Sequence, residues 1–218
     1  MLLCHSRTMI FPDPRAETEE GIIAVGGELS VETLCEAYSK GIFPWPQEGL
    51  PMLWFSPERR GILEFTEFHV QKSLKKYARK NPQIFFTINQ AFEQVIRECR
   101  LQERKGQSGT WILGEMELAY TELFRAGYVL SLECWRPGLE NQAELIGGIY
   151  GVMLDGHFSG ESMFFREPNA SKLALWQLVE YLRERGHQWM DIQMVTPVLE
   201  AFGGKYISRE EFLQKRGL

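Results

Sequence analysis

Three consecutive strand patterns followed by a long helix pattern constrain the fold of this 218-residue chain more than any other feature. The strand patterns are YVLSLECW, ELIGGIYGVM and HFSGESMF, and the turn-forming segments RPGLENQ and LDG connect them. A helix is predicted over about 170–185, with Asn169 or Ser171 as its N-cap and Gly186 after its last turn. An antiparallel meander followed by a helix and a further strand, QWMDIQ, predicts an α+β domain with helices packed on a sheet.

The sequence before this domain has a different pattern, rich in glycine and proline. It contains the stretches FPDPR, GIIAVGGELS, GIFPWPQEGLP and WFSPERRG, which are typical of loops and turns. One helix is predicted among them, with Ser30 as its N-cap and Gly41 at its end. We therefore predict a small N-terminal module at residues 1–61 and a larger α+β domain at residues 62–218.

A basic segment stands out in a chain whose formal net charge is −5. Residues 62–106 contain nine Lys and Arg against five Asp and Glu, and the densest part, HVQKSLKKYARK at 69–80, has no acidic residue. At helical spacing one face carries Lys72, Lys76, Arg79 and Lys80, while the other can turn inward Phe68, Val70, Leu74 and Tyr77. Such a helix exposes either a merely solvated face or a surface that binds nucleic-acid phosphates.

Other features exclude several classes of protein. The four cysteines are widely spaced without a CxxC pair, and the four histidines are scattered, so we predict neither disulfides nor a metal site. No apolar run reaches the roughly 20 residues that a transmembrane helix needs. We therefore expect a cytoplasmic monomer that has no membrane partner.

The predicted domain resembles the acetyltransferase-like (GNAT-type) fold of N-acyltransferases. In that fold a Gly-rich loop, which opens the helix after the meander, binds the pyrophosphate of coenzyme A through backbone N–H groups. The corresponding stretch here, FFREPNAS at 164–171, has no glycine, and Pro168 lacks an N–H donor. This favours acyl transfer to an amine without an acyl-CoA donor, and no cofactor is predicted.

Seven stretches in order resemble the leucyl/phenylalanyl-tRNA–protein transferase family. They are GIIAVGGELS, AYSKGIFPWP, LWFSPERRGIL, GTWI, LIGGIYGV, GESMF with NASK, and DIQ. The resemblance implies a two-domain bacterial aminoacyltransferase. It would move Leu or Phe, and less well Met, from aminoacyl-tRNA to acceptor proteins with N-terminal Arg or Lys. That modification would mark the acceptors for degradation by the N-degron pathway.

The resemblance also implies roles for particular residues. The catalytic acid and its partner amide correspond to Asp191 and Gln193, and the glutamate that lines the aminoacyl site corresponds to Glu161. The aromatics that hold the terminal adenosine of the tRNA correspond to Trp45 and Trp111, so that the N-terminal module contributes to the adenosine site. The pocket for the donor side chain corresponds to Ile149, Phe158, Leu175, Leu182 and Met190. The basic cluster along the tRNA corresponds to Lys72, Lys76, Arg79 and Lys80.

Four positions depart from the family's usual pattern. Phe165 stands where a serine is usual, and Leu130 stands where a histidine is often found. In the late stretch VLEAFGG, Val198 and Ala201 replace the usual histidine and serine. These positions bear on donor preference and on contacts with the acceptor.

The residues themselves suggest how such a transfer could proceed. Asp191 and Gln193 are two apart, so on a strand they project from the same face, where they could deprotonate and orient an attacking amine. Alternatively, the ribose hydroxyl of the substrate takes the proton, and both residues only position the reactants. Trp45 lies between Pro44 and Pro46, which stiffen the loop and make its ring a suitable platform for a base.

Two other functions remain open from the sequence. The chain could be an N-acyltransferase that uses a small thioester donor, and coenzyme A would then stabilise it. It could instead be a catalytically silent RNA-binding or degron-binding module, which would bind RNA equally well without Asp191.

Overall fold

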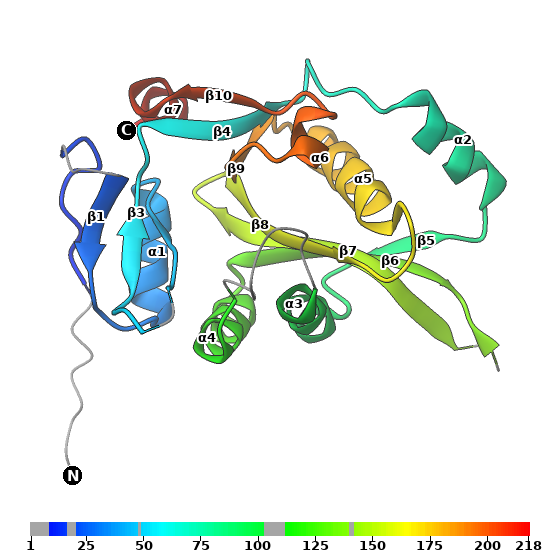
Figure 1. The fold of residues 1–218 in the computed structure, drawn as a ribbon, viewed down its shortest axis with the longest axis horizontal. Helices are drawn as coiled ribbons and strands as arrows, with labels where there is room; N and C mark the ends of the chain where they lie inside the picture. Colours follow the sequence, from blue (N-terminus) through cyan, green and yellow to red (C-terminus); the bar gives the residue numbers. More distant parts are fainter. Residues whose placement is uncertain (1–8, 17–20, 48, 103–111, 140–141) are drawn as a thin grey trace, which may run out of the picture.

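The computed structural model describes residues 9–16, 21–47, 49–102, 112–139 and 142–218. They form an α+β structure with one large and one small sheet (Figure 1). The helices are α1 (Val31–Ser39), α2 (Lys72–Lys80), α3 (Phe92–Leu101), α4 (Gly114–Arg125), α5 (Ala170–Glu184), α6 (Pro197–Glu200) and α7 (Arg209–Arg216). Within this described part of the chain, every helix is too short or too polar to cross a membrane.

The large sheet has seven strands in the order β10-β4-β9-β8-β7-β6-β5. Its strands are β4 (Arg59–Glu64), β5 (Phe85–Ile88), β6 (Val129–Pro137), β7 (Ala143–Leu154), β8 (His157–Phe165), β9 (Trp189–Gln193) and β10 (Lys205–Ser208). Neighbouring strands are antiparallel except β8 and β9, which are parallel with the register pair Ser159↔Asp191. The predicted meander is confirmed as β6–β7–β8, and the predicted helix after it is confirmed as α5.

Helices cover both faces of this sheet (Figure 1). One hydrophobic core packs α1, α3 and α4 against one face, and it includes Tyr38, Phe92, Tyr120 and Tyr150. A second core packs α5 and Leu74 of α2 against the other face. Leu74 is buried and Phe68, Val70 and Tyr77 pack partly against this second core, which confirms the predicted inward face of the basic helix.

The small sheet lies in the N-terminal part and has the order β1-β3-β2. Its strands are β1 (Ile22–Val25), β2 (Phe43–Pro44) and β3 (Leu53–Phe55). Trp54 and Phe43 of this sheet belong to the same core as α3 and α4. The predicted helix α1 begins as expected, because the Ser30 side chain accepts from the Thr33 N–H at 3.1 Å.

Strand β4 was not expected, because its sequence, RRGILE, follows the loop-like stretch WFSPE. It pairs with both β9 and β10 and therefore belongs to the large sheet. A domain boundary after residue 61 would divide this strand. This matters for the candidate site, because Arg60 lies in β4.

Candidate active site

Glu161 lies on a β-bulge in β8. The β7–β8 register passes from Tyr150↔Ser162 to Gly151↔Gly160, which leaves Glu161 without an opposite residue. The strands approach closely here, and a Cβ on Gly151 would lie 2.2 Å from the Ser159 carbonyl oxygen. Bulges redirect side chains and are frequent beside active sites, so this one gives Glu161 a direction that regular strand alternation would not.

Three polar side chains surround the Glu161 carboxylate. Gln193 Nε2 donates to Oε1 at 2.8 Å, and the Tyr120 hydroxyl donates to Oε2 at 3.3 Å. The Tyr38 hydroxyl shares a short hydrogen bond with that of Tyr120. Sequence reasoning missed both tyrosines, because each occupies an ordinary inward position of its helix, α1 or α4.

The surroundings of Glu161 bring its proton equilibrium close to neutral pH. The pKa of Glu161 is raised to about 7. Loss of hydration is the main cause and the charge of Asp191 adds to it, while hydrogen bonds from Tyr38, Gln193 and Tyr120 lower the pKa in part. Burial, reinforced by Glu161, raises the pKa of both tyrosines, so that their hydroxyls remain protonated donors. Glu161 as a residue is half-buried, and a carboxyl with a pKa near 7 is a candidate for proton exchange at neutral pH.

Asp191 is engaged in a buried ion pair. Arg60 Nε donates to Oδ1 at 2.8 Å and Nη2 donates to Oδ2 at 2.6 Å. Ser159 Oγ donates to Oδ2 at 3.2 Å, and the Gln193 N–H donates to Oδ1 at 2.9 Å. Asp191 and Arg60 are 0% and 1% exposed.

These contacts bear on the predicted role of Asp191 as the base that meets the attacking amine, which stays a prediction. Four donors occupy its carboxylate oxygens, and its side chain is inaccessible to a substrate. Asp191 and Gln193 also do not act side by side, because the β4–β9 register skips Ile192 and Gln193 has a left-handed backbone with φ of 56°. Asp191 holds the main chain of Gln193, while the Gln193 amide reaches Glu161 on the neighbouring strand.

Arg60 packs against two aromatic rings. Its guanidinium carbon is 4.4 Å from the Phe43 ring centroid and 4.5 Å from the Phe212 ring centroid. Phe43 belongs to the small sheet and Phe212 to the C-terminal helix α7. The ion pair therefore lies where N-terminal, central and C-terminal segments of the chain meet.

Trp45 follows β2 and is half-buried. Its ring packs edge-on against Phe43, with 6.4 Å between centroids, and its backbone N–H donates to the Leu53 carbonyl at 2.8 Å. Trp45 is thus connected through Phe43 to Arg60. The other predicted adenosine residue, Trp111, lies outside the described residues.

The five residues predicted to form the donor side-chain pocket are brought together, but in a packed core. They pack between α5 and the large sheet, and each is at most 4% exposed. Leu175 and Leu182 come from α5, and Ile149, Phe158 and Met190 come from the sheet. Binding of a Leu or Phe side chain among them would require this core to open, and the pocket remains a prediction.

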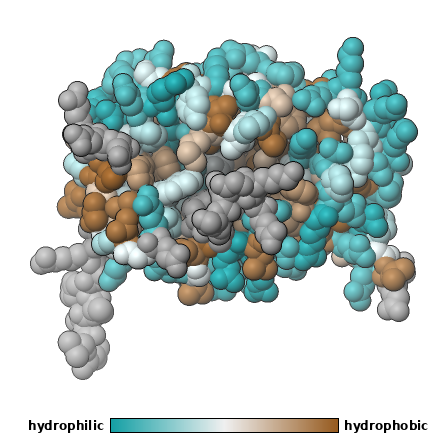
Figure 2. All heavy atoms as spheres, in the orientation of Figure 1, coloured by the Kyte–Doolittle hydropathy of each residue, from teal (hydrophilic) through white to brown (hydrophobic). Residues whose placement is uncertain are grey.

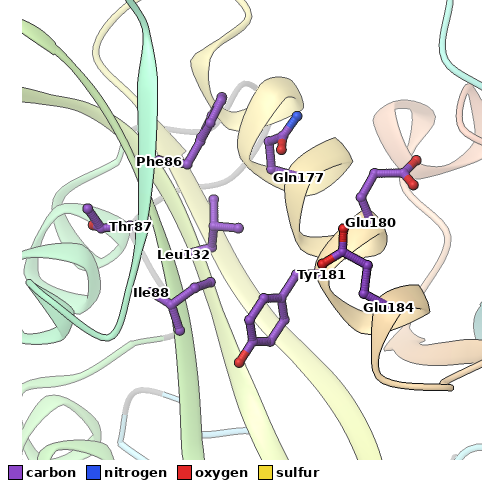
Figure 3. Close-up of a pocket in the computed structure, with 8 residues that line it drawn as sticks. All are labelled: Phe86, Thr87, Ile88, Leu132, Gln177, Glu180, Tyr181 and Glu184. Carbon is purple, nitrogen blue, oxygen red and sulfur yellow. The ribbon is translucent and has the colours of Figure 1, made fainter.

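Two cavities lie near α5, and none of the predicted catalytic or donor-pocket residues lines either. Figure 3 shows the first, of about 210 Å³, between α5 and the strands β5 and β6. Aromatic and aliphatic side chains from the strands face Gln177, Glu180, Tyr181 and Glu184 from the helix. It lies on the sheet face covered by α5, whereas Tyr38 and Tyr120 belong to the opposite core.

The second cavity, of about 180 Å³, lies between α2, the start of α5 and α6. Two of the positions that depart from the family pattern, Val198 and Ala201, line it together with Lys172. Of the other two, Phe165 is 51% exposed and Leu130 is buried.

The basic cluster is on the surface, as predicted. All five cations of α2 are exposed, and none of them forms an ion pair with a residue in the described ranges: Lys72, Lys75, Lys76, Arg79 and Lys80. Figure 2 shows hydrophilic side chains over this end of the molecule. A free set of cations is available to a polyanion. In the same described ranges, no three His, Cys, Asp or Glu side chains gather as metal ligands would.

Comparison with family models and with known proteins gives the same family in each case. The family model for leucyl/phenylalanyl-tRNA protein transferase matches residues 62–216, and the model for its N-terminal domain matches residues 27–58. A leucyl/phenylalanyl-tRNA–protein transferase from Pseudoalteromonas translucida is 44% identical over 199 residues, 91% of this chain and 81% of the relative. One from Maridesulfovibrio salexigens is 46% identical over 204 residues, 94% of this chain and 83% of the relative.

Similarity to solved structures is much weaker. FemX aligns with a TM-score of 0.48 at 11% identity, over 84% of this chain and 70% of the FemX chain. That likeness is too distant to bear on function. The family models and the relatives are sufficient by themselves: the chain belongs to the leucyl/phenylalanyl-tRNA–protein transferase family.

Proposed function

We propose that this protein transfers Leu or Phe, and less efficiently Met, from aminoacyl-tRNA to the N-terminal Arg or Lys of acceptor proteins. The modified proteins would then enter the N-degron degradation pathway. Besides family membership, one observation supports this proposal most: a half-buried Glu161 with a pKa of about 7, held by Gln193 at 2.8 Å. Transfer to an amine needs a group that accepts a proton near neutral pH.

In the proposed step, the nitrogen of the acceptor α-amine attacks the carbonyl carbon of the aminoacyl ester. The new C–N bond forms as the bond to the ribose oxygen breaks, giving an amide and a free hydroxyl. Glu161 accepts the proton that the amine loses and passes it to the ribose oxygen as that oxygen leaves. Because the ester is already activated, positioning of the two reactants and a modest base suffice.

Gln193 and the two tyrosines orient Glu161 in this scheme. The Gln193 amide donates to Oε1 and Tyr120 donates to Oε2, so both carboxylate oxygens have a fixed direction. Proton transfer to the substrate's own ribose hydroxyl is the alternative. In that case Glu161 would hold the ammonium of the acceptor without changing its protonation, and the pH dependence of turnover would not follow Glu161.

The rest of the proposal concerns the donor. The acetyltransferase-like large sheet, followed by α5, would present the reacting ester beside Glu161. The N-terminal module would supply Trp45, which together with Trp111 would stack on the terminal adenosine. The exposed cations of α2 would contact tRNA phosphates, which position a nucleic acid without reading its sequence.

Mass spectrometry tests the proposed activity directly. The protein is mixed with leucyl-tRNA or phenylalanyl-tRNA and a peptide that begins with Arg, and the peptide should gain the mass of one Leu or Phe residue. A matched peptide that begins with Glu should stay unmodified. Absence of transfer to the Arg peptide, with intact charged tRNA at the end of the reaction, would contradict the proposal.

A second test addresses the adenosine platform. Trp45→Ala should reduce the use of a minimal donor, phenylalanyl-adenosine, as well as that of full phenylalanyl-tRNA, because both contain the stacked base. The loss of stacking corresponds to about 1–3 kcal/mol of donor binding. If only full tRNA is affected, Trp45 acts elsewhere.

The thioester hypothesis is less favoured. FFREPNAS lacks the glycines of a pyrophosphate loop, and Asn169, at the start of α5, has a left-handed backbone with φ of 72° and no side-chain cap bond. A rise in melting temperature with coenzyme A would support that alternative over aminoacyl-tRNA.

A further inference from the structure

Arg60 is a buried cation that touches none of the groups expected to contact a substrate. It reaches the candidate site only through Asp191, in a bidentate pair with distances of 2.8 and 2.6 Å. The rings of Phe43 and Phe212 also pack against its guanidinium, with their centroids 4.4 and 4.5 Å from the guanidinium carbon. An arginine packed against two rings and held by two hydrogen bonds can move very little, and it therefore fixes the Asp191 carboxylate.

The fixed carboxylate in turn determines the backbone of Gln193. Asp191 Oδ1 accepts from the Gln193 N–H at 2.9 Å, at the point where β9 departs from regular pairing. Gln193 has φ of 56°, a left-handed conformation that is unfavourable for a residue with a side chain. A local hydrogen bond from Asp191 stabilises this conformation, which aims the amide at Glu161.

Strand β4 also approaches this point closely. A Cβ on Gly61 would lie 2.9 Å from the Met194 carbonyl carbon and 3.1 Å from that of Gln193. Gly61, the residue after Arg60 in β4, thus packs directly against the main chain at Gln193. Loss of the ion pair would therefore displace the Gln193 main chain.

Stability alone does not account for this ion pair. Removing two charges from water is costly, and buried pairs are often no more stabilising than apolar residues of similar size. Arg60 Nη1 is buried and lacks a hydrogen-bond partner within the described part of the chain, which adds to that cost. An arrangement of this kind is better explained by geometry that it imposes on its neighbours.

We propose that Arg60 is a positioning residue for aminoacyl transfer, acting through Asp191 and the Gln193 main chain on the Gln193–Glu161 hydrogen bond. The proposal rests on the function proposed above. Arg60 is distinct from the catalytic residues, because it reaches neither substrate nor Glu161. Its removal should therefore lower kcat while the KM values of donor and acceptor remain nearly constant.

Arg60→Lys keeps the charge but loses the bidentate geometry. We expect kcat to fall about 10–100-fold, the size of effect that a displacement of about 1 Å produces, with both KM values within about twofold of wild type. Arg183→Lys is the matched control, since Arg183 also lies over two rings, Phe65 and Phe68, but contacts no residue of the candidate site. It should retain wild-type kcat.

A double-mutant cycle separates positioning from general damage. In the Gln193→Ala background, Arg60→Lys should change kcat less than about threefold, because the group through which it acts is already gone. Losses that multiply in the double variant would overturn the proposal, as would a loss that appears mainly in KM. If Arg60→Lys fails to fold, the double variant Arg60→Met with Asp191→Asn removes both charges of the pair. Its kcat should equal that of Gln193→Ala. A wild-type kcat in this double variant would overturn the proposal.

Hydrogen exchange tests the same link without any activity. The Gln193 N–H should exchange at least about tenfold faster in Arg60→Lys, while the Ser208 N–H, held by Glu211 at 2.8 Å, should not change. Unchanged Gln193 protection would overturn the role of Arg60 even if the protein transfers amino acids. Conversely, a wild-type protein without transferase activity but with this exchange pattern would refute the proposed function and leave the structural link intact.

Discussion

Replacement of Glu161 by glutamine tests whether the folded protein raises the pKa of this carboxyl. The pKa of Glu161 is raised from 4.5 to about 7, chiefly because the protein removes water from the carboxylate. At about 1.4 kcal/mol per pH unit, this interval corresponds to about 3–4 kcal/mol. Glu161 is only half-buried, and the solvent that reaches it reduces the expected effect to about 2 kcal/mol.

The sign follows from the protons bound in each state. Between pH 4.5 and 7 the unfolded carboxyl has lost its proton while the folded one retains it. The free energy of unfolding of the wild type therefore falls as the pH rises through this window. Glu161→Gln removes the titration, so its stability relative to wild type should improve by about 2 kcal/mol between pH 4.5 and 7.5.

Urea unfolding of both proteins at half-unit pH intervals measures this difference. Glu211→Gln is a control of opposite sign, because hydrogen bonds from the Ser208 backbone and hydroxyl lower the pKa of Glu211. The wild type should be more stable to unfolding than Glu211→Gln above pH 4.5, and this difference should disappear as the pH falls. A Glu161→Gln difference that stays constant from pH 4 to 8 would refute the assigned environment of Glu161.

The same variant should lose catalysis. Turnover of the wild type should rise with pH and level off above about 7, as Glu161 ionises. Glu161→Gln should lose this dependence and about 10²–10⁴-fold in kcat. Retention of the pH profile would favour proton transfer to the substrate's ribose hydroxyl.

Three further changes have definite expected results. Tyr120→Phe removes a donor to Glu161, so the pKa of Glu161 should rise, and the pH profile of kcat should move to higher pH; an unmoved profile would show that this hydrogen bond is unimportant. Gly151→Ala places a Cβ 2.2 Å from the Ser159 carbonyl oxygen, and should reduce the free energy of unfolding by about 1–3 kcal/mol in urea titrations. Gly114→Ala is the control without a clash, because its Cβ would meet only Arg100 Nη1, at 3.8 Å. The third change neutralises four cations on the exposed face of α2: Lys72, Lys76, Arg79 and Lys80. It should raise the KM for full tRNA and flatten the log–log salt dependence of binding by roughly 0.7–0.9 per phosphate contact, while the use of a minimal aminoacyl-adenosine donor stays unaffected. An unchanged salt slope would show that these residues do not contact tRNA.

The sequence by itself determined the elements that depend on local signals. The meander, α5 and the basic α2 all follow from periodicity and capping over segments of eight or more residues, as does the start of α1 at Ser30. The family motifs also identified Glu161 and Gln193, which the structure brings to 2.8 Å of each other. These features could be read from the chain because residues close in sequence produce them.

The small sheet and β4 could not be recognised in this way. The small-sheet strands have only two to four residues and lie among glycines and prolines, so they depend on pairing with distant partners. Arg60 and Asp191 are 131 positions apart, and no local pattern connects them. Only the tertiary structure could therefore show that Asp191 is inaccessible.

The direction of the key side chains was also a tertiary result. Spacing of two residues predicts a shared face only on a regular strand. The register skips Ile192 in β9 and Glu161 in β8, and each irregularity depends on how closely a neighbouring strand can approach at Gly61 or Gly151. Motifs supplied the residue types of the site, while close packing of the strands decided which carboxylate meets solvent and which is held by Arg60.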